Sequence, residues 1–442
     1  MDILPGVLAV RKARLFFGDP SLQERHRRSD KAFTRERKLR FDVVRVGVLR
    51  KTVKSLQLQL HAFFEALTGS AREAVTPSAW TQGRAKLRHT AFIELNQVAV
   101  VATFYGLTGQ VELWRGPRLW AIDSSLLRLP HSAALFDFFG GQQPVHYSGP
   151  KPMRIPQARL SVLDDLGNDM GIEARVGKWE EGELDLACGH LPSLRPGDLL
   201  LCDRGDAGCL FLARVLDGGG QFLVRCSRTS FAAAQNLFAR DEAGASLTTT
   251  LLAPTRGQQV QASGLPLQLP VRFVSVRLPS GELEVLVTSL LDEKLYPFQE
   301  FLSLYHQRWG SETYYKILKS RLDLENFTGL TVEAILQDIH ASVFLSNLES
   351  LVTRPAAVQL KATEKEGSHP RKPNKAVTFH TLKHRVFDLL CGSDPIEEVL
   401  TQLTELFLAN PVTIRSHRTP PRFPPTPLRS LPFQKRLRKA TF

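Results

Sequence analysis

Four polar residues stand at helical spacing late in the chain: Tyr305, Arg308, Glu312 and Lys319. If they belong to one straight helix, in which each residue turns by roughly 100°, their side chains share a stripe of about 60°. Most of the surrounding positions are apolar or aromatic, which predicts a largely buried helix. A carboxylate, two cations and a phenol on a buried stripe need a polar partner. A metal ion together with a phosphate chain would satisfy all four.

Two aspartates with a similar context lie upstream. Asp123 follows the apolar run Leu119–Ile122, and Asp203 follows the mostly apolar run Asp198–Cys202. Aspartate is disfavoured in strands, so its place at the end of an apolar run calls for an explanation. Carboxylates at the ends of neighbouring strands can converge at one edge of a sheet, and a helix packed on that sheet can supply a third, here Glu312.

Three such carboxylates would hold hard divalent ions, Mg²⁺ or Mn²⁺. Two ions about 4 Å apart activate an attacking water and stabilise the leaving oxygen in phosphoryl transfer. Arg308 and Lys319 would then hold phosphate oxygens, the arginine as a fork and the lysine as a point charge. Trp309, beside the same site, could stack on an unpaired base.

Each of these residues also has a simpler interpretation. Either aspartate taken alone fits a turn or a cap. Glu312 stands four residues after Arg308, so the two can form an ion pair on a helix, although such a pair is costly when buried. Packing in the core is the favoured alternative for Trp309.

Composition restricts the class of partner. The chain has 442 residues, enough for two or three domains. Its net charge of +13 favours a polyanion, either nucleic acid or an anionic membrane surface. Its apolar runs are too short to span a bilayer, and the N-terminus lacks a secretory cleavage site. Five cysteines without a CxxC pair give neither a zinc signature nor a disulfide framework. We expect a cytoplasmic protein that does not enter a membrane.

Residues 1–110 show helical periodicity. Apolar residues at helical spacing predict a helix over Asp42–Leu67 that ends near Gly69. A second helix is expected to begin at Thr76-Pro77, with threonine as its cap. Arg84 and Lys86 lie near the end of that helix, which is compatible with a helix-turn-helix reader of DNA. A solvated basic face explains the same two residues equally well.

From residue 111 the period changes to that of strands. The order of the expected elements predicts a mixed α/β layer. These elements are a strand, the hairpin Arg159–Leu163 with Gly171–Val176, a second strand, the helix Asp206–Leu216 and the strand Gln221–Cys226. Short strands then follow at Thr248–Leu252, Gln258–Gln261, Val271–Arg277 and Glu282–Thr288. The last part of the chain is expected to hold a helix over Val332–Thr353, a polar linker over Lys361–Lys375, and an extended basic tail over Thr419–Phe442.

Three acidic motifs carry a family resemblance. They are strand-Asp123-Ser124-Ser125, strand-Asp203-Arg204-Gly205 and Tyr305-x2-Arg308-x3-Glu312-x6-Lys319. These motifs resemble those of bacterial insertion-sequence transposases of the DDE class. The match is to the subgroup with a Y-R-E-K signature and a β-rich insertion between the second and third acids. The segments Ser29–Leu39 and Val75–Leu87 are similar to that family's N-terminal region.

The resemblance implies a fold and a set of site residues. The expected fold is α/β, with a ribonuclease-H-like catalytic core, a helical N-terminal DNA-binding region and a β-rich insertion. The expected parts are a helical DNA-binding region (1–110), the first part of the core (111–227), the insertion (228–296), the second part of the core with the catalytic helix (297–355), and a C-terminal helical and basic region (356–442). Asp123, Asp203 and Glu312 would be both the catalytic residues and the ligands of Mg²⁺ or Mn²⁺. Tyr305, Arg308 and Lys319 would contact the DNA backbone.

The resemblance also implies an activity and partners. The enzyme would cut transposon ends in double-stranded DNA with water and join the freed 3′-hydroxyl to target DNA, as a homodimer in the nucleoid of a bacterial cytoplasm. One position departs from the family: Asp206 stands after Asp-Arg-Gly, where an aromatic residue is common. Two alternatives remain open. The chain could be a non-catalytic DNA-binding protein derived from a transposase, or a ribonuclease-H-like nuclease that never joins strands.

Overall fold

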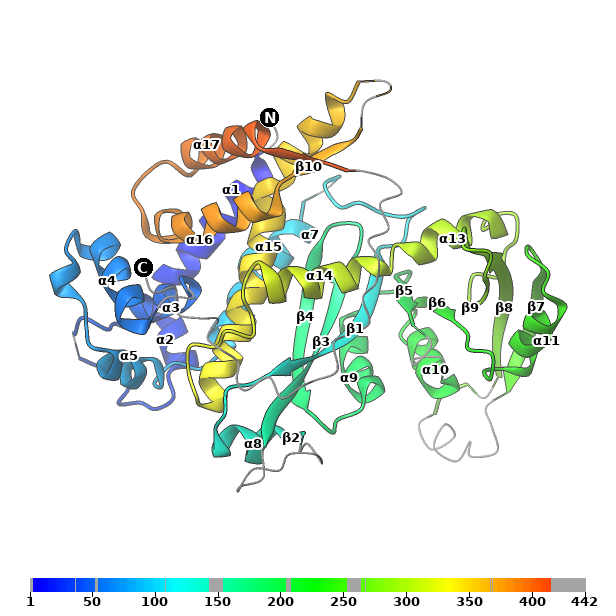
Figure 1. Cartoon of the computed structure of the whole chain (residues 1–442), viewed down its shortest axis with the longest axis horizontal. Coiled ribbons are helices and arrows are strands. Elements are labelled where there is room, and N and C mark those ends of the chain that lie inside the picture. The colour runs from blue at the N-terminus through cyan, green and yellow to red at the C-terminus, as the bar shows by residue number, and fades with distance from the viewer. Residues whose placement is uncertain are drawn as a thin grey trace. The chain divides into compact units, whose positions relative to one another are not determined.

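The structure is a computed structural model, which describes residues 3–35, 37–51, 55–107, 109–142, 154–203, 208–252, 264–266, 268–365, 367 and 369–414 (Figure 1). The chain forms two compact units. The first comprises residues 1–110, 127–158 and 316–442, and the second comprises residues 111–126 and 159–315. Residues 227 and 296 lie inside the second unit, and residue 355 lies inside the first.

The N-terminal part of the first unit is helical, as its periodicity predicts. Its α-helices are α1 (Leu4–Gly18), α2 (Pro20–His26), α3 (Phe41–Leu49), α4 (Leu56–Thr68), α5 (Pro77–Arg84), α6 (Thr90–Leu95) and α7 (Ala102–Tyr105). A 3₁₀ turn, Ala71–Glu73, follows α4, and a π-helical turn, Asn96–Val101, joins α6 to α7. Thr76 caps α5 as expected, because its hydroxyl oxygen accepts a hydrogen bond from the backbone N–H of Ala79 at 3.2 Å.

The single helix expected over Asp42–Leu67 is wrong, because two helices, α3 and α4, occupy this range. The apolar periodicity continues through both. The second helix nevertheless has its own start, where the Ser55 hydroxyl oxygen accepts a hydrogen bond from the N–H of Leu58 at 3.4 Å. The expected end is confirmed: Gly69 takes a left-handed conformation with φ of 76°.

The long helix α15 (Val332–Ala362) is the centre of the first unit, where α1, α3, α6, α16 and α17 pack against it (Figure 1). It begins where the sequence predicts but continues beyond Thr353 and through Pro355. The other C-terminal elements are α16 (Lys375–Cys391), α17 (Ile396–Ala409) and the antiparallel pair β10 (Arg371–Pro373) and β11 (Pro411–Thr413). The expected linker Lys361–Lys375 therefore contains a short strand, and the tail Thr419–Phe442 lies outside the described residues.

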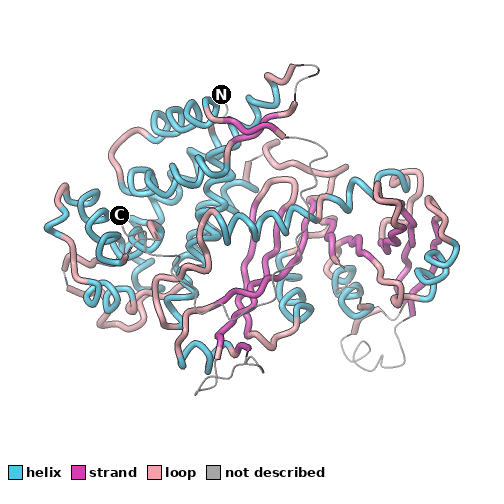
Figure 2. The backbone as a smooth tube through the Cα atoms, viewed as in Figure 1, coloured by secondary structure: helices cyan, strands magenta, loops and turns pink. Residues whose placement is uncertain are grey.

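A mixed sheet forms the second unit (Figure 2). Its strands are β1 (Leu119–Arg128), β3 (Ile155–Asp165), β4 (Met170–Lys178), β5 (Leu199–Cys202), β6 (Gln221–Arg225), β7 (Ser246–Leu252), β8 (Gln268–Arg277) and β9 (Leu283–Thr288). Their order is β4-β3-β1-β5-β6-β9-β8-β7. β1, β5 and β6 are parallel, whereas β9, β8 and β7 continue the sheet antiparallel. The predicted α/β layer and the hairpin β3–β4 are confirmed.

The segment expected as an insertion does not form a sheet of its own. Strands β7, β8 and β9 are close to three of the four predicted strands, and β9 hydrogen-bonds to β6, so they extend the main sheet. The fourth, Gln258–Gln261, lies outside the described residues. The helices of this unit are α9 (Glu183–His190), α10 (Cys209–Asp217), α11 (Ala232–Arg240), α13 (Phe298–His306) and most of α14 (Trp309–Ser320), with a 3₁₀ turn at Leu191–Ser193.

Two short elements of the first unit remain to be described. α8 (Ala133–Phe139) and β2 (Gly141–Gln142) lie in the first unit, where β2 pairs antiparallel with Ile155 and Pro156 at the start of β3. Within the described parts of the chain, no helix is both long enough and apolar enough to cross a membrane.

Candidate active site

Two adjacent parallel strands bring Asp123 and Asp203 together. The register of β1 and β5 places Ala121 opposite Leu201, and two further residues along each chain lead to the two aspartates. Because side chains alternate between the faces of a strand, each aspartate projects from the same face as the residue two positions before it. Asp203 follows the end of β5 as predicted. Asp123 lies inside β1, which continues to Arg128, so the expectation that it follows the end of a strand is wrong.

Helix α13 covers this face of the sheet. Leu199 and Leu201 share one apolar core with Leu304 and Tyr305 of the helix. The ring of Tyr305 is 2% exposed, and its hydroxyl lies 3.3 Å from the carbonyl oxygen of Cys202 and 3.4 Å from Oδ1 of Asp203. The phenol of Tyr305, a predicted contact of the DNA backbone, is thus buried beside the second aspartate.

The polar stripe is not carried by one straight helix. α13 ends at His306, α14 begins at Trp309, and Arg308 lies in the turn between them. The N–H groups of Arg308 and Ser311 donate to carbonyl oxygens three residues earlier, at 3.0 Å each, which is the tighter 3₁₀ pattern. The helix α14 is also not buried all round: Glu312 is exposed, whereas Tyr315 and Leu318 are buried.

Arg308 and Glu312 form an ion pair, as their spacing allows. Nη2 of Arg308 lies 3.3 Å from Oε1 of Glu312. The arginine side chain is 4% exposed and the glutamate side chain 53% exposed, so the pair joins a buried cation to a half-exposed anion. The guanidinium also lies 5.7 Å from the ring centroid of Tyr305.

The charges of this site act on one another. Burial lowers the pKa of the Arg308 guanidinium, but the groups around it outweigh this effect and raise the pKa above its ordinary value. These groups are the phenol of Tyr305 and the carboxylates of Asp203, Asp123 and Glu312. The pKa of Asp123 is raised, first by burial and then by the charge of Glu312, although Arg308 opposes both. All three predicted carboxylates therefore lie within electrostatic reach of one arginine, and Glu312 remains near Asp123 despite its ion pair.

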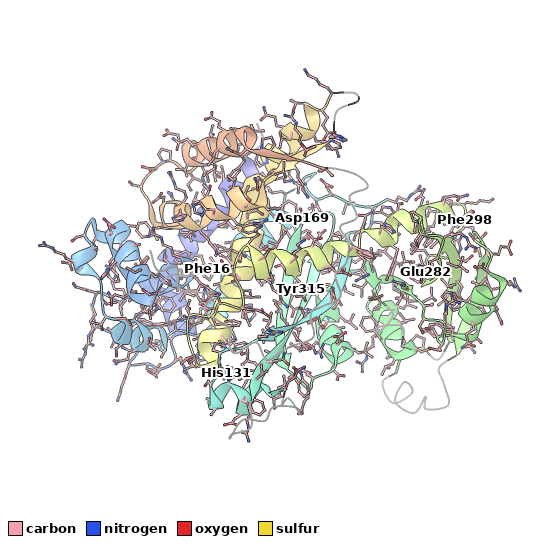
Figure 3. The ribbon with its side chains drawn as sticks, in the orientation of Figure 1. Phe16, His131, Asp169, Glu282, Phe298 and Tyr315 are labelled. Carbon is pink, nitrogen blue, oxygen red and sulfur yellow. The ribbon has the colours of Figure 1, made fainter. Side chains whose placement is uncertain are left out.

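Tyr315, which the sequence analysis did not single out, fixes α14 to the sheet (Figure 3). Its hydroxyl donates to the carbonyl oxygen of Asp123 at 2.6 Å and to that of Leu160 at 3.1 Å. The first of these bonds ties the helix of Glu312 directly to the backbone of the first aspartate. Tyr315 stands three residues after Glu312, and this spacing was the only available signal, because aromatic residues on helices usually do no more than pack.

Arg159 of β3 is a second residue that sequence reasoning missed. Its Nη1 donates to the hydroxyl of Ser124 at 3.2 Å and forms an ion pair with Glu183 at the start of α9. Ser124 in turn donates its N–H to Oδ1 of Asp123 at 2.8 Å. Arg159 therefore adds a cation next to the first aspartate. In the sequence it looks like an ordinary polar position of an alternating strand.

The remaining predicted site residues of α14 are partly exposed. Trp309 is 42% exposed and lies beside His306, with 6.4 Å between the ring centroids, so the favoured core packing of this residue is wrong. Lys319 is about a third exposed and lies 3.7 Å from Oε1 of Glu325. Both side chains are accessible to a large ligand, whereas Asp206 lies outside the described residues.

Arg84, a predicted DNA contact, is buried in the first unit. Its side chain is only 5% exposed, and Nη2 pairs with Oδ1 of Asp338 at 2.8 Å while Nε donates to Gln337 at 2.6 Å. The guanidinium of Arg84 is the partner of a buried carboxylate of α15. Lys86, two residues later, is exposed.

The carboxylate oxygens of the site are suitable ligands for a hard divalent ion, but the side chains are not grouped around one position. Carboxylate oxygens are the ligands that Mg²⁺ and Mn²⁺ prefer, and the pKa of Asp123 is raised mainly because the carboxyl group is buried. Among the residues that the structure describes, however, no three His, Cys, Asp or Glu side chains are grouped closely enough to hold a metal. Glu312, the third predicted ligand, pairs with Arg308.

Comparisons with known proteins show which family the chain belongs to. A solved structure of the piggyBac transposase, in a synaptic complex with hairpin DNA, is similar to this chain with 13% identity and a TM-score of 0.46, over 91% of this chain and 86% of that one. A comparison with curated proteins gives no match. The family model of the transposase DDE domain matches residues 114–348, more than half of the chain and a range that contains Asp123, Asp203 and Glu312. The chain therefore belongs to the family of transposases with a DDE domain.

Proposed function

We propose that this transposase cuts the ends of a mobile DNA element and joins the freed 3′-hydroxyl to target DNA at the site of Asp123, Asp203 and Glu312. The observation that carries the proposal is the parallel register of β1 and β5, which leads to Asp123 in β1 and to Asp203 just after β5, with Arg308 and Glu312 in electrostatic reach of them. The strand order β4-β3-β1-β5-β6, a hairpin followed by parallel strands, supports a ribonuclease-H-like core.

The three carboxylates are the residues that would hold Mg²⁺ or Mn²⁺. Such ions, when bound, activate water and stabilise the leaving oxygen of a phosphodiester. Tyr305 keeps Asp203 in place through its hydroxyl, and Tyr315 keeps the start of α14 against β1. To bind the metal ion, Glu312 must give up its ion pair with Arg308. The guanidinium of Arg308 is then free to bind a phosphate oxygen.

The partners follow from the same reasoning. The net charge of +13 favours a polyanion, and double-stranded DNA is the polyanion on which this family acts. The exposed residues Trp309, Lys319 and Lys86 remain candidates for DNA contacts, by stacking in the first case and by charge in the others. A homodimer that holds two element ends, in a bacterial cytoplasm, completes the proposal.

Substituting a single carboxylate tests the proposal. Asp203→Asn and Glu312→Gln should each abolish divalent-dependent cleavage of a duplex that carries the element's ends, while binding of that duplex persists. Glu282→Gln, at an exposed turn of the same unit, is the matched control and should cut normally. If cleavage survives both site substitutions, the assigned residues are wrong.

One observation favours a non-catalytic DNA-binding protein. The ion pair of Glu312 with Arg308 is closed, and a protein that never binds a metal would keep it so. The wild-type chain decides between the two functions: Mg²⁺-dependent nicking excludes the non-catalytic protein. Strand-transfer products on a supercoiled target then exclude a nuclease that only cuts.

A further inference from the structure

A buried arginine in the first unit has donors without partners. Arg45 of α3 is 2% exposed, and its guanidinium carbon lies 4.3 Å from the ring centroid of Phe17 and 4.5 Å from that of Phe41. Nη2 donates to the carbonyl oxygen of Phe17 at 3.0 Å. Nε and Nη1 are buried and have no hydrogen-bond partner.

This arrangement is expensive for a group that only packs. Burial lowers the pKa of Arg45 to about 10, so the guanidinium remains charged at neutral pH. The two aromatic faces offset part of the cost through cation–π contacts. They leave two N–H donors unsatisfied, and buried donors of a charged group are normally paired.

Arg45 lines a cavity of about 300 Å³ in the N-terminal helices. The rings of Phe17 and Phe41 form its apolar walls, and the exposed residues Arg35 and Arg40 also line it. The cavity lies wholly within the first unit, between the end of α1, the segment before α3, and α3 itself. Its size accommodates a phosphate group with part of a sugar.

Two carboxylates in the wall do not complete the pairing of Arg45. Asp42 binds Arg40, with Nη2 to Oδ2 at 3.0 Å. Asp19 accepts hydrogen bonds from the N–H and the hydroxyl of Ser21, at 2.9 and 2.7 Å, and caps α2. Both acids are engaged by other residues, whereas Nε and Nη1 of Arg45 are buried without a hydrogen-bond partner.

We propose that this cavity binds a phosphate group, with Arg45 as the buried donor and Arg35 as the cation at its rim. The group is either a phosphate of the DNA backbone or a free phosphate. Binding of a DNA phosphate rests on the proposed function, because it would place an end of the mobile element on α3. Binding of a free phosphate does not depend on the proposed function.

Binding measurements on the full chain distinguish the two sources. The variants are Arg45→Met, which keeps the packing length between the rings, and Arg35→Gln at the rim. Arg72→Gln, exposed and outside the cavity lining, is the control for the loss of one positive charge. The free source is probed by thermal stabilisation with inorganic phosphate and pyrophosphate. The DNA source is probed by affinity for an end duplex across a series of salt concentrations.

If the phosphate belongs to DNA, Arg45→Met should weaken duplex binding about tenfold, as expected for a charged hydrogen bond. It should also reduce the slope of log K against log salt by about 0.9, because one phosphate contact is lost. If the phosphate is free, the stabilisation by phosphate or pyrophosphate should disappear in Arg45→Met. In either case Arg72→Gln should behave like the wild type in the affected assay.

The proposal is overturned if the two cavity variants match Arg72→Gln in both assays. If Arg45→Met fails to fold, Arg35→Gln decides, since its side chain is exposed and its loss leaves the core intact. Neither assay measures cleavage. A chain that binds phosphate here but never cuts DNA would contradict the proposed function and leave this site standing.

Discussion

Replacing Arg84 by methionine should destabilise the first unit strongly, although sequence reasoning places this residue on a DNA-reading face. The guanidinium is the main cation for the buried carboxylate of Asp338, at 2.8 Å, and it also bonds Gln337 and the carbonyl oxygen of Ala334. Breaking a buried ion pair from one side typically costs about 3–5 kcal/mol. Asp338 keeps a hydrogen bond from the N–H of Thr328 at 2.7 Å, so we expect the lower end, about 3 kcal/mol.

Urea unfolding, followed by hydrogen exchange of peptides from α15, measures this loss within the first unit. With a slope near 3 kcal/mol per molar, the midpoint should fall by roughly 1 M. Lys86→Met removes an exposed charge two residues away and should shift the midpoint by far less. Adding Asp338→Asn to Arg84→Met should restore part of the stability, because the unpaired charge is gone. This reasoning would be refuted if Arg84→Met and Lys86→Met shifted the urea midpoint by equal, small amounts and only Arg84→Met weakened DNA binding.

Two further predictions concern buried groups. Tyr315→Phe leaves two carbonyl oxygens without their shared donor and should cost about 1–3 kcal/mol; differential scanning calorimetry of both proteins tests this, and an unchanged melting temperature would mean that the hydroxyl does not hold α14. Burial, with the charge of His89, lowers the pKa of His340 from 6.5 to about 3 against the opposing effect of Glu333. Between these two pKa values the unfolded chain binds a proton that the folded chain does not, so the free energy of unfolding should fall as pH drops from 6.5 toward 3. His340→Phe should flatten this part of the stability profile, and an identical slope in both proteins would contradict the assignment.

The sequence predicts the central strands of the sheet well because its signals are local. Apolar runs mark β1 and β5, and the aspartates that follow these runs lie in matching register. The extent of β1 could not be predicted, because polar residues such as Ser124 and Ser125 hide a strand that continues past the site. The break at Arg308 was also hidden, since residues in a 3₁₀ turn keep nearly the spacing of a helix.

Long-range contacts explain the other differences. A basic residue near a helix end looks the same whether it faces DNA or a buried carboxylate 254 positions away, as Arg84 does. The same holds for Tyr305, whose phenol could have met a phosphate but meets Asp203. The role of Tyr315 depends on two strands that only the fold brings together.

The most direct test of the three-carboxylate site is to map where a bound metal lies. Fe²⁺ in place of Mg²⁺, with ascorbate and peroxide, generates radicals that cut the polypeptide next to the ion. The site described above predicts cuts near Asp123, near Asp203 and near Glu312, all suppressed by excess Mg²⁺ and lost in Asp203→Asn. Cuts confined to one of these segments, or cuts that Mg²⁺ does not suppress, would contradict a metal site shared by the three carboxylates.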